Sequence, residues 1–162
     1  MGFQSTIALN QGFGVVGESV FAGPRRAQPG VVKGTAANIV VGRAFTIDTA
    51  DGLFQPGGTG VYGGILCNPK ALQSIGTSAG GPLAPTLTVP AGTVCEFATM
   101  DELCVALVGA ANIGDGVYFV QADGTLGAGN AGAGQTQIPG ARVERFANAA
   151  AGLAVISLTS VK

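Results

Sequence analysis

Short runs of apolar and β-branched residues, separated by glycine-rich turns, fill the chain from about residue 39 onward. The run NIVVGRAFTI at 38–47 leads into the turn sequence TADG, and the run GVYGGILCN at 60–68 ends at Asn68-Pro69. Runs of this length that are bounded by turn residues are typical of β-strands. We therefore predict strands over 38–47 and 60–68.

The clearest strand pattern lies in NIGDGVYFVQADGTLGAG, residues 112–129. There IGDG predicts a turn, VYFV a strand and ADG a tight hairpin turn, after which TL begins the return strand. Residues 86–99 predict a strand, a turn at Pro90-Ala91-Gly92 and a second strand, whereas residues 100–111 fit either a strand or a short helix. The remaining predictions are loops at 73–85 and 130–137 and two closing strands within 138–160.

No segment carries the apolar period of a long amphipathic helix. Several short strands joined by glycine turns indicate an all-β domain, a small β-barrel or sandwich, over 39–162. Residues 1–38 differ, because prolines and glycines recur there and Phe3, Phe13 and Phe21 follow no helical period. Such a segment cannot bury its own backbone, so we predict an extended N-terminal arm that lies along another surface.

Charged side chains are scarce, at 10% of the 162 residues against about 25% in an ordinary soluble domain. The net charge is −1, hydrophobic residues make up 47%, and the mean hydropathy is +0.45. The longest apolar stretch, 103–111, is shorter than the roughly 18 residues that span a bilayer, so no membrane partner is expected. A soluble chain with so few charges hides much of its surface in an assembly, which indicates a function in association.

The glycines of GFGVVG at 12–17 have the G-x-G-x-x-G spacing of a dinucleotide-binding turn. The glycines and prolines of residues 23–30 leave no room for the helix that must follow such a turn. The region around Ala36 also lacks the acidic residue that would bind the ribose. We therefore interpret this stretch as an extended segment loosened by glycine, and we expect no cofactor.

The residue types of many active sites are missing from this chain. Without histidine, Ser-His-Asp and Cys-His nucleophiles and mixed Cys/His zinc sites are excluded. Acidic residues lie mainly beside glycines, as in Asp51-Gly52, and Asp48 and Asp51 flank one turn, so turn chemistry explains them. We expect no enzyme activity, no metal and no small-molecule substrate. The cysteines predict small apolar core residues, with a Cys95–Cys104 bridge left open; they are Cys67, Cys95 and Cys104.

The 8 basic residues are scattered, apart from Arg25-Arg26 and the pair Arg142 and Arg145. A surface that binds nucleic acid needs clustered positive charge, so no nucleic-acid partner is predicted. Arg25-Arg26 stand between Pro24 and Pro29, which favours a rigid and exposed presentation. We predict that the two arginines contact acidic groups or carbonyl oxygens of a neighbouring chain, and the alternative is a solvated loop.

Three stretches carry a family resemblance: MGFQSTIALNQGFGVVGE at the start, FAGPRRAQPGVV after it, and PGARVERFANAAAGLAVISLTS near the end. They resemble the small structural cement, or decoration, proteins of tailed-bacteriophage capsids. The resemblance implies a protein made in the bacterial host cytoplasm that binds the outer surface of an assembled head. It also implies a homodimer or homotrimer that clamps neighbouring subunits of the major capsid protein. The alternatives are another virion part, such as a tail or fibre-tip protein, and an adhesion module.

Under this hypothesis the N-terminal stretch supplies the interface. We predict that its three phenylalanines anchor the arm on a neighbouring chain, with burial under the chain's own barrel as the alternative for each of them. The two arginines add charge-assisted contacts. The predicted capsid or self-interface consists of Phe3, Gln4, Phe13, Phe21, Pro24, Arg25 and Arg26.

Overall fold

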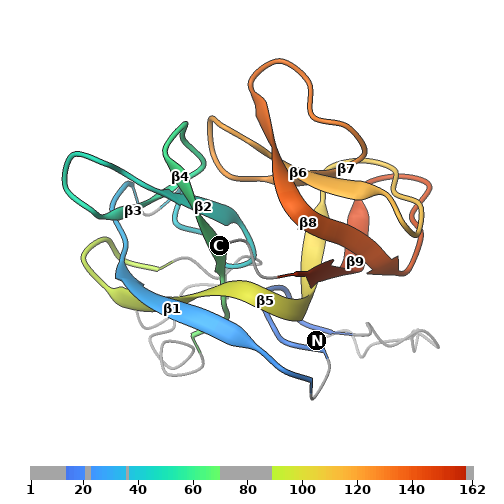
Figure 1. Ribbon diagram of the computed structural model, residues 1–162, viewed down its shortest axis with the longest axis horizontal. Helices are drawn as coiled ribbons and strands as arrows, with labels where there is room; N and C mark the ends of the chain where they lie inside the picture. The colour runs from blue at the N-terminus through green and yellow to red at the C-terminus, as the bar shows by residue number, and fades with distance from the viewer. Residues whose placement is uncertain (1–13, 21–22, 36, 70–88, 160–162) are drawn as a thin grey trace, which may run out of the picture.

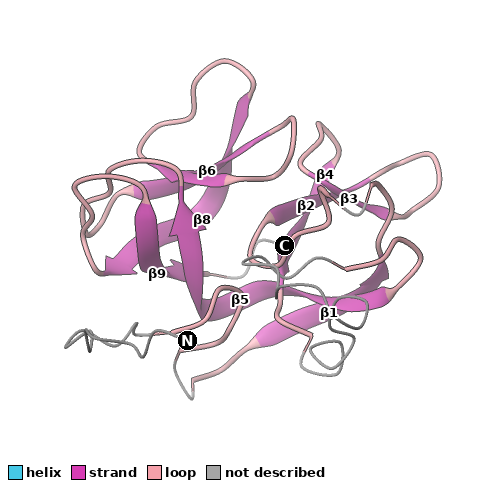
Figure 2. Cartoon of the chain, turned by 180° about the vertical axis from the view of Figure 1, so that it is seen from behind, coloured by secondary structure: helices cyan, strands magenta, loops and turns pink. Residues whose placement is uncertain are grey.

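The computed structural model describes residues 14–20, 23–35, 37–69 and 89–159. Within these residues the chain forms strands and turns and no helix, so the predicted all-β fold is confirmed (Figures 1 and 2). The strands are β1 (Arg26–Val31), β2 (Ala44–Ile47), β3 (Phe54–Pro56), β4 (Val61–Leu66), β5 (Val94–Leu107), β6 (Gly116–Val120), β7 (Leu126–Ala128), β8 (Gln135–Arg145) and β9 (Gly152–Leu158).

The second half of β5 belongs to a closed barrel, which lies on the right in Figure 1. The strand order is β5-β7-β6-β8-β9, and β9 returns to pair with β5 from Asp101 to Leu107. The β5–β7 contact that completes the ring is parallel and short. It consists of the pair Leu107–Leu126 and a hydrogen bond of 2.9 Å from the Val108 N–H to the Leu126 carbonyl. Of the two predicted architectures, the structure therefore adopts the barrel.

The first half of β5 belongs to a second sheet, on the left in Figure 1. There β1 pairs with one edge of β5 and β4 with the other, and β2 and β3 follow β4. The sheet curls round on itself, because Val32 forms a bridge to Phe54 and the Lys33 N–H donates to the Phe54 carbonyl at 2.8 Å. The two lobes thus share β5 as a common strand.

Each lobe encloses apolar side chains that its strands direct inward. In the second sheet the rings of Phe54 and Phe97 stack with centroids 4.1 Å apart, and Phe45 lies 5.2 Å from Phe97. Gly30 permits this arrangement, because a Cβ there would lie 2.3 Å from the Phe54 ring. The barrel core is mainly aliphatic, with buried side chains from β5, β8 and β9 that include Leu103, Val105, Val143 and Ile156.

Most predicted strands lie where the turn residues placed them. The predictions at 60–68 and in the hairpin at 112–129 are confirmed by β4, β6 and β7. The two closing strands are confirmed by β8 and β9, but β8 begins at Gln135, so the predicted loop at 130–137 ends earlier than expected. The choice at 100–111 is resolved as strand, since β5 continues to Leu107. The predicted loop at 73–85 lies outside the described residues.

The predicted strand at 38–47 is only partly correct, because β2 begins at Ala44. Ile39 and Val41 are buried in the core of the second sheet, but residues 37–42 form turns and one isolated bridge instead of a strand, and the Asn38 N–H donates to the Thr35 carbonyl at 2.9 Å. Their apolar character therefore reflects burial, and burial alone does not require a strand ladder.

Part of the stretch predicted as an arm lies on strands of its own chain. The pair β1–β5 runs antiparallel from Arg26–Met100 to Val31–Val94. Ser19 also forms a bridge to Leu103 of β5. Residues 26–31 thus belong to the second sheet, while the boundary at residue 38 stays a prediction.

A buried hydroxyl group offers a test of the packing between the lobes. The Tyr62 oxygen is buried without a hydrogen-bond partner, and its ring packs on Phe119 of the barrel with centroids 6.1 Å apart. An unpaired buried hydroxyl is unfavourable, so Tyr62→Phe should raise the free energy of unfolding by about 1 kcal/mol in urea denaturation. The control Tyr118→Phe, on a half-buried ring, should change it by less than about 0.5 kcal/mol. A loss of stability in Tyr62→Phe would show that the hydroxyl group has a partner.

Candidate functional site

The chain changes from one edge of β5 to the other just before β1. The Val20 N–H donates to the Glu102 carbonyl, and the Cys104 N–H donates to the Glu18 carbonyl, at 2.8 and 2.9 Å. Over these residues β9 occupies the other edge of β5, so residues 17–20 lie on the same edge as β4. Since β1 and β4 pair with opposite edges, the chain crosses β5 between Val20 and β1.

Asp101 of β5 lies at this crossing. Its side chain is 4% exposed, and its Oδ1 accepts hydrogen bonds from the Ser19 hydroxyl at 2.7 Å and the Glu102 N–H at 2.8 Å. The Arg25 Nε lies 3.7 Å from Asp101 Oδ2, and an Arg25 guanidinium nitrogen lies 3.9 Å from Glu96 Oε2. Both distances are too long for hydrogen bonds, so the guanidinium, 52% exposed, keeps donors for a further partner.

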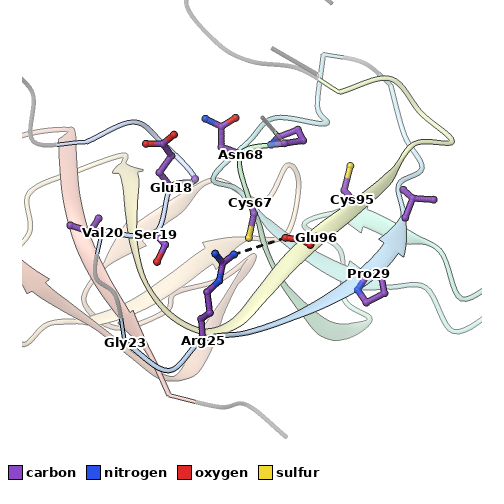
Figure 3. Close-up of a pocket in the computed structure, with 13 residues that line it drawn as sticks. Glu18, Ser19, Val20, Gly23, Arg25, Pro29, Cys67, Asn68, Cys95 and Glu96 are labelled. Carbon is purple, nitrogen blue, oxygen red and sulfur yellow. Dashed lines mark ion pairs between the residues drawn. The ribbon is translucent and has the colours of Figure 1, made fainter. Parts of the chain in front are cut away.

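A groove of about 960 Å³ opens beside the crossing (Figure 3). Arg25 projects into it from below, with its guanidinium below Cys67 and joined by the dashed line to Glu96 in the view shown. Burial raises the pKa of the Cys67 thiol to about 11, so it stays protonated at neutral pH and is no nucleophile. The described residues that line the groove are Gly17, Glu18, Ser19, Val20, Gly23, Arg25, Pro29, Cys67, Asn68, Pro69, Val94, Cys95 and Glu96.

The structure describes three of the predicted interface residues, which are consecutive in sequence, and Arg25 among them lines this groove. Pro24, Arg25 and Arg26 are all exposed, in line with the expected presentation between two prolines. The acidic partners that Arg25 has here belong to its own chain, and the Arg26 carbonyl accepts a hydrogen bond from the Thr99 hydroxyl at 3.3 Å. Their contacts with a neighbouring chain stay a prediction. The other predicted residues lie outside the described part of the chain: Phe3, Gln4, Phe13 and Phe21.

The barrel carries an exposed apolar surface, away from the groove, that the sequence analysis did not predict. Ile113 is 65% exposed and Phe146 is 43% exposed. Their segments run side by side, because Ala111 and Asn148 exchange two backbone hydrogen bonds of 2.8 Å. We call Ile113 and Phe146 the apolar tip. In the sequence the one signal of this surface is that Phe146 is aromatic. Its exposure could not be predicted, because it depends on where β8 ends.

Phe146 also adopts an unusual backbone conformation. Its φ is 67°, and among the described residues it is the one non-glycine residue with a positive φ. A bulky residue rarely occupies this left-handed region, and such outliers cluster at functional sites. The exposure and the strain together make the apolar tip a candidate contact surface.

The strain at Phe146 can be measured by comparing two truncations. Phe146→Gly and Phe146→Ala both remove the ring, but only glycine adopts a positive φ without steric conflict. We expect the glycine variant to be more stable than the alanine variant by about 1 kcal/mol, the reverse of the usual order in strands. Thermal and urea denaturation of both variants would measure the difference. Equal stability, or a more stable alanine variant, would contradict the strained backbone.

The charged groups of the described turns behave as turn chemistry predicts. Asp48 accepts a hydrogen bond from the Ala50 N–H and Asp51 one from the Leu53 N–H, both at 2.9 Å. Both carboxylates also bind the Lys33 ammonium group, and these hydrogen bonds lower the pKa of each aspartate. Neither carboxyl is thereby suited to donate a proton near neutral pH.

The described residues contain no group of three or more His, Cys, Asp or Glu side chains placed to hold a metal ion. No helix capable of crossing a bilayer is found among them either. All three cysteines are buried and free, which confirms their interpretation as core residues. The Cys95–Cys104 bridge that the sequence left open is therefore not formed, and the reason is that the two residues lie far apart on the same extended strand.

Comparison with known proteins shows which family and which solved structures this chain is similar to. No curated protein matches the sequence. A chain of the solved structure "The capsid of Myoviridae Phage XM1" has the same fold, with a TM-score of 0.69 at 18% sequence identity over 98% of each chain. Residues 3–159 match the family model described as structural cement protein (E217 gp24/Pam3 gp6). The chain therefore belongs to the structural cement protein family, whose members are structural proteins of phage capsids.

Proposed function

We propose that this protein binds the outer surface of an assembled phage head and stabilises contacts between subunits of the major capsid protein. The observation that carries the proposal is the family match, which spans residues 3–159 and so covers both lobes. The proposal also assigns the protein to the virion, with a second copy of itself and the major capsid protein as its partners.

The physical properties of the chain support a mechanical role. Charged residues make up only 10% of the sequence, so contact with other protein removes few ionic groups from water. Each square ångström of apolar surface buried at the joint contributes about 25 cal/mol. Many copies bound to one shell add such contributions, which opposes local separation of capsid subunits.

The candidate surfaces lie on different lobes of one body. The groove lined by Arg25 belongs to the second sheet and the crossing, and the apolar tip belongs to the barrel. Because both lobes share β5, contacts made by one lobe are coupled to those of the other through a single continuous strand. A protein that touches two capsid subunits in this way links them.

Binding to undecorated heads tests the proposal directly. Purified protein should co-sediment with heads of the cognate phage up to a fixed ratio of copies per head. Decorated heads should release their DNA at a higher temperature than bare heads, as followed by dye fluorescence. Absence of saturable binding, or binding only to tails or fibres, would refute the proposal and favour another virion component.

Variants that leave the fold intact test the predicted interface. Arg26→Ala removes an exposed cation next to Arg25, and we expect about tenfold weaker binding to heads because charge-assisted contacts are lost. Deletion of residues 2–13 removes Phe3, Gln4 and Phe13 and leaves β1 in place, and it should weaken binding at least as much. The matched control Arg142→Ala, an exposed arginine on β8, should bind as the wild type does. Unchanged affinity in both test variants would contradict the assigned interface.

A further inference from the structure

The strand that joins the two lobes is bent. The pairing of β5 with β1 shifts register between Ala98 and Met100, just before β5 begins to pair with β9 at Asp101. An irregularity of this kind bends a strand locally, and Figure 1 shows that β5 changes direction before it enters the barrel. A few residues at a bend are enough for a hinge, so a second contact is needed if the angle between the lobes is to be fixed.

Apolar side chains also meet between the lobes. Ala44, Ile65 and Ala98 of the second sheet belong to the same buried cluster as the side chains of the barrel, and Tyr62 packs against that cluster. Apolar contact of this kind is favourable but has no preferred direction. It therefore defines the angle between the lobes less sharply than hydrogen bonds do.

The turn between β6 and β7, residues 121–125, supplies directional contacts to the second sheet. The Ala44 N–H donates to the Gly124 carbonyl at 2.9 Å, and the Gly58 N–H donates to the Gln121 carbonyl at 2.7 Å. Both bonds have the short distances of good backbone hydrogen bonds. They join the backbone of the second sheet to the backbone of the barrel at a place remote in sequence from β5.

An arginine of the second sheet reinforces these bonds. Arg43 Nη1 donates to the Asp123 carbonyl at 3.3 Å and lies 3.5 Å from Asp123 Oδ2. The other oxygen of Asp123 accepts hydrogen bonds from the N–H and the hydroxyl of Thr125, at 3.0 and 2.8 Å. The second sheet is thus attached to a turn whose shape is fixed by its own hydrogen bonds.

Two glycines allow the backbones of the two lobes to approach this closely. A Cβ at Gly124 would lie 2.2 Å from the Ala44 carbonyl oxygen, and one at Gly57 would lie 2.5 Å from the Gln121 carbonyl oxygen. The φ angles of Gly124 and Gly57 are 76° and 65°. Gly52 has a similar φ of 72°, but a Cβ there would meet nothing within 4 Å. At Gly124 and Gly57 the close approach of the lobes therefore requires glycine in addition to the backbone angle.

We infer that the turn at 121–125 is a latch, which fixes the angle between the two lobes and keeps β5 from acting as a hinge. Its bonds to Ala44, Gly58 and Arg43 are directional, and they lie away from the bend in β5. Asp123 and Gly124 therefore serve twice, since they also close the hairpin of β6 and β7. This inference concerns the free protein and does not depend on binding to a capsid.

The angle can be followed by the distance between two spin labels, one on each lobe. Ala91→Cys, at a turn that leads into β5, and Ala149→Cys, between β8 and β9, replace exposed residues. The three native cysteines are buried, so the labels attach to the introduced ones, and labelling of the wild type checks this. Electron–electron double resonance should give a narrow distance distribution when the latch is intact.

Gly124→Ala places a methyl group against Ala44 and should broaden this distribution and shift its maximum. Gly52→Ala is the matched control, because it introduces the same backbone strain without crowding, and it should leave the distribution unchanged. Arg43→Ala removes only the side-chain part of the latch and should give a smaller change in the same direction. Far-UV circular dichroism confirms that each variant is folded, and Arg43→Ala keeps the test open if Gly124→Ala misfolds.

Hydrogen exchange locates the change. In Gly124→Ala the N–H groups of Ala44 and Gly58 should exchange about tenfold faster, as expected when the bonds that they donate across the lobes are weakened, whereas the β5–β9 ladder should change little. An unchanged distance distribution in Gly124→Ala, or in Arg43→Ala if that variant alone folds, would overturn the inference. The same shift in Gly52→Ala, or exchange that accelerates equally in both lobes, would overturn it as well.

Discussion

The pairing of β5 with partners on both of its edges is the interaction on which the rest of the structure depends. Its first half carries β1 and β4, and its second half carries β9, β7 and residues 17–20. Neither lobe closes without it, because the barrel ring returns to β5 and the second sheet is joined through it. The strand continues without a break through Met100, Asp101 and Glu102, although its pairing with β1 shifts register between Ala98 and Met100.

Asp101 explains how that passage is possible. A carboxylate buried between two apolar cores would be very unfavourable alone, but here it receives hydrogen bonds from Ser19 and from a backbone N–H. Arg25 adds a positive charge on the other oxygen. The segment before β1 thus stabilises the strand that it crosses, and this links the N-terminal stretches that carry the family resemblance to the centre of the fold.

Local turn chemistry made much of the fold predictable. The hairpin of β6 and β7 is encoded by ADG between two apolar runs, and Asp123 closes that turn by accepting hydrogen bonds from Thr125. The start of β2 was misplaced because Ile39 and its neighbours are apolar for burial in a turn, and a pattern of apolar residues does not separate the two cases. The unbroken length of β5 was not predictable either, since Asp101 is accommodated by Ser19, 82 residues away in sequence.

The candidate site also has a part that the sequence predicts and a part that it does not. Pro24, Arg25 and Arg26 stood out because their composition differs from the rest of the chain, and their exposure is as expected. Phe146 did not stand out, because a left-handed backbone angle in a phenylalanine leaves no mark in the sequence.

The backbone hydrogen bonds between residues 17–20 and β5 have a mechanical consequence. Tension applied along this segment ahead of Gly14 would load the bonds of Gly17, Glu18 and Val20 together, in shear, rather than opening them one after another. The force would then pass into the strand that runs through both cores, instead of peeling a peripheral loop from the surface. The segment 17–20 is thereby fastened to the one strand that both lobes share.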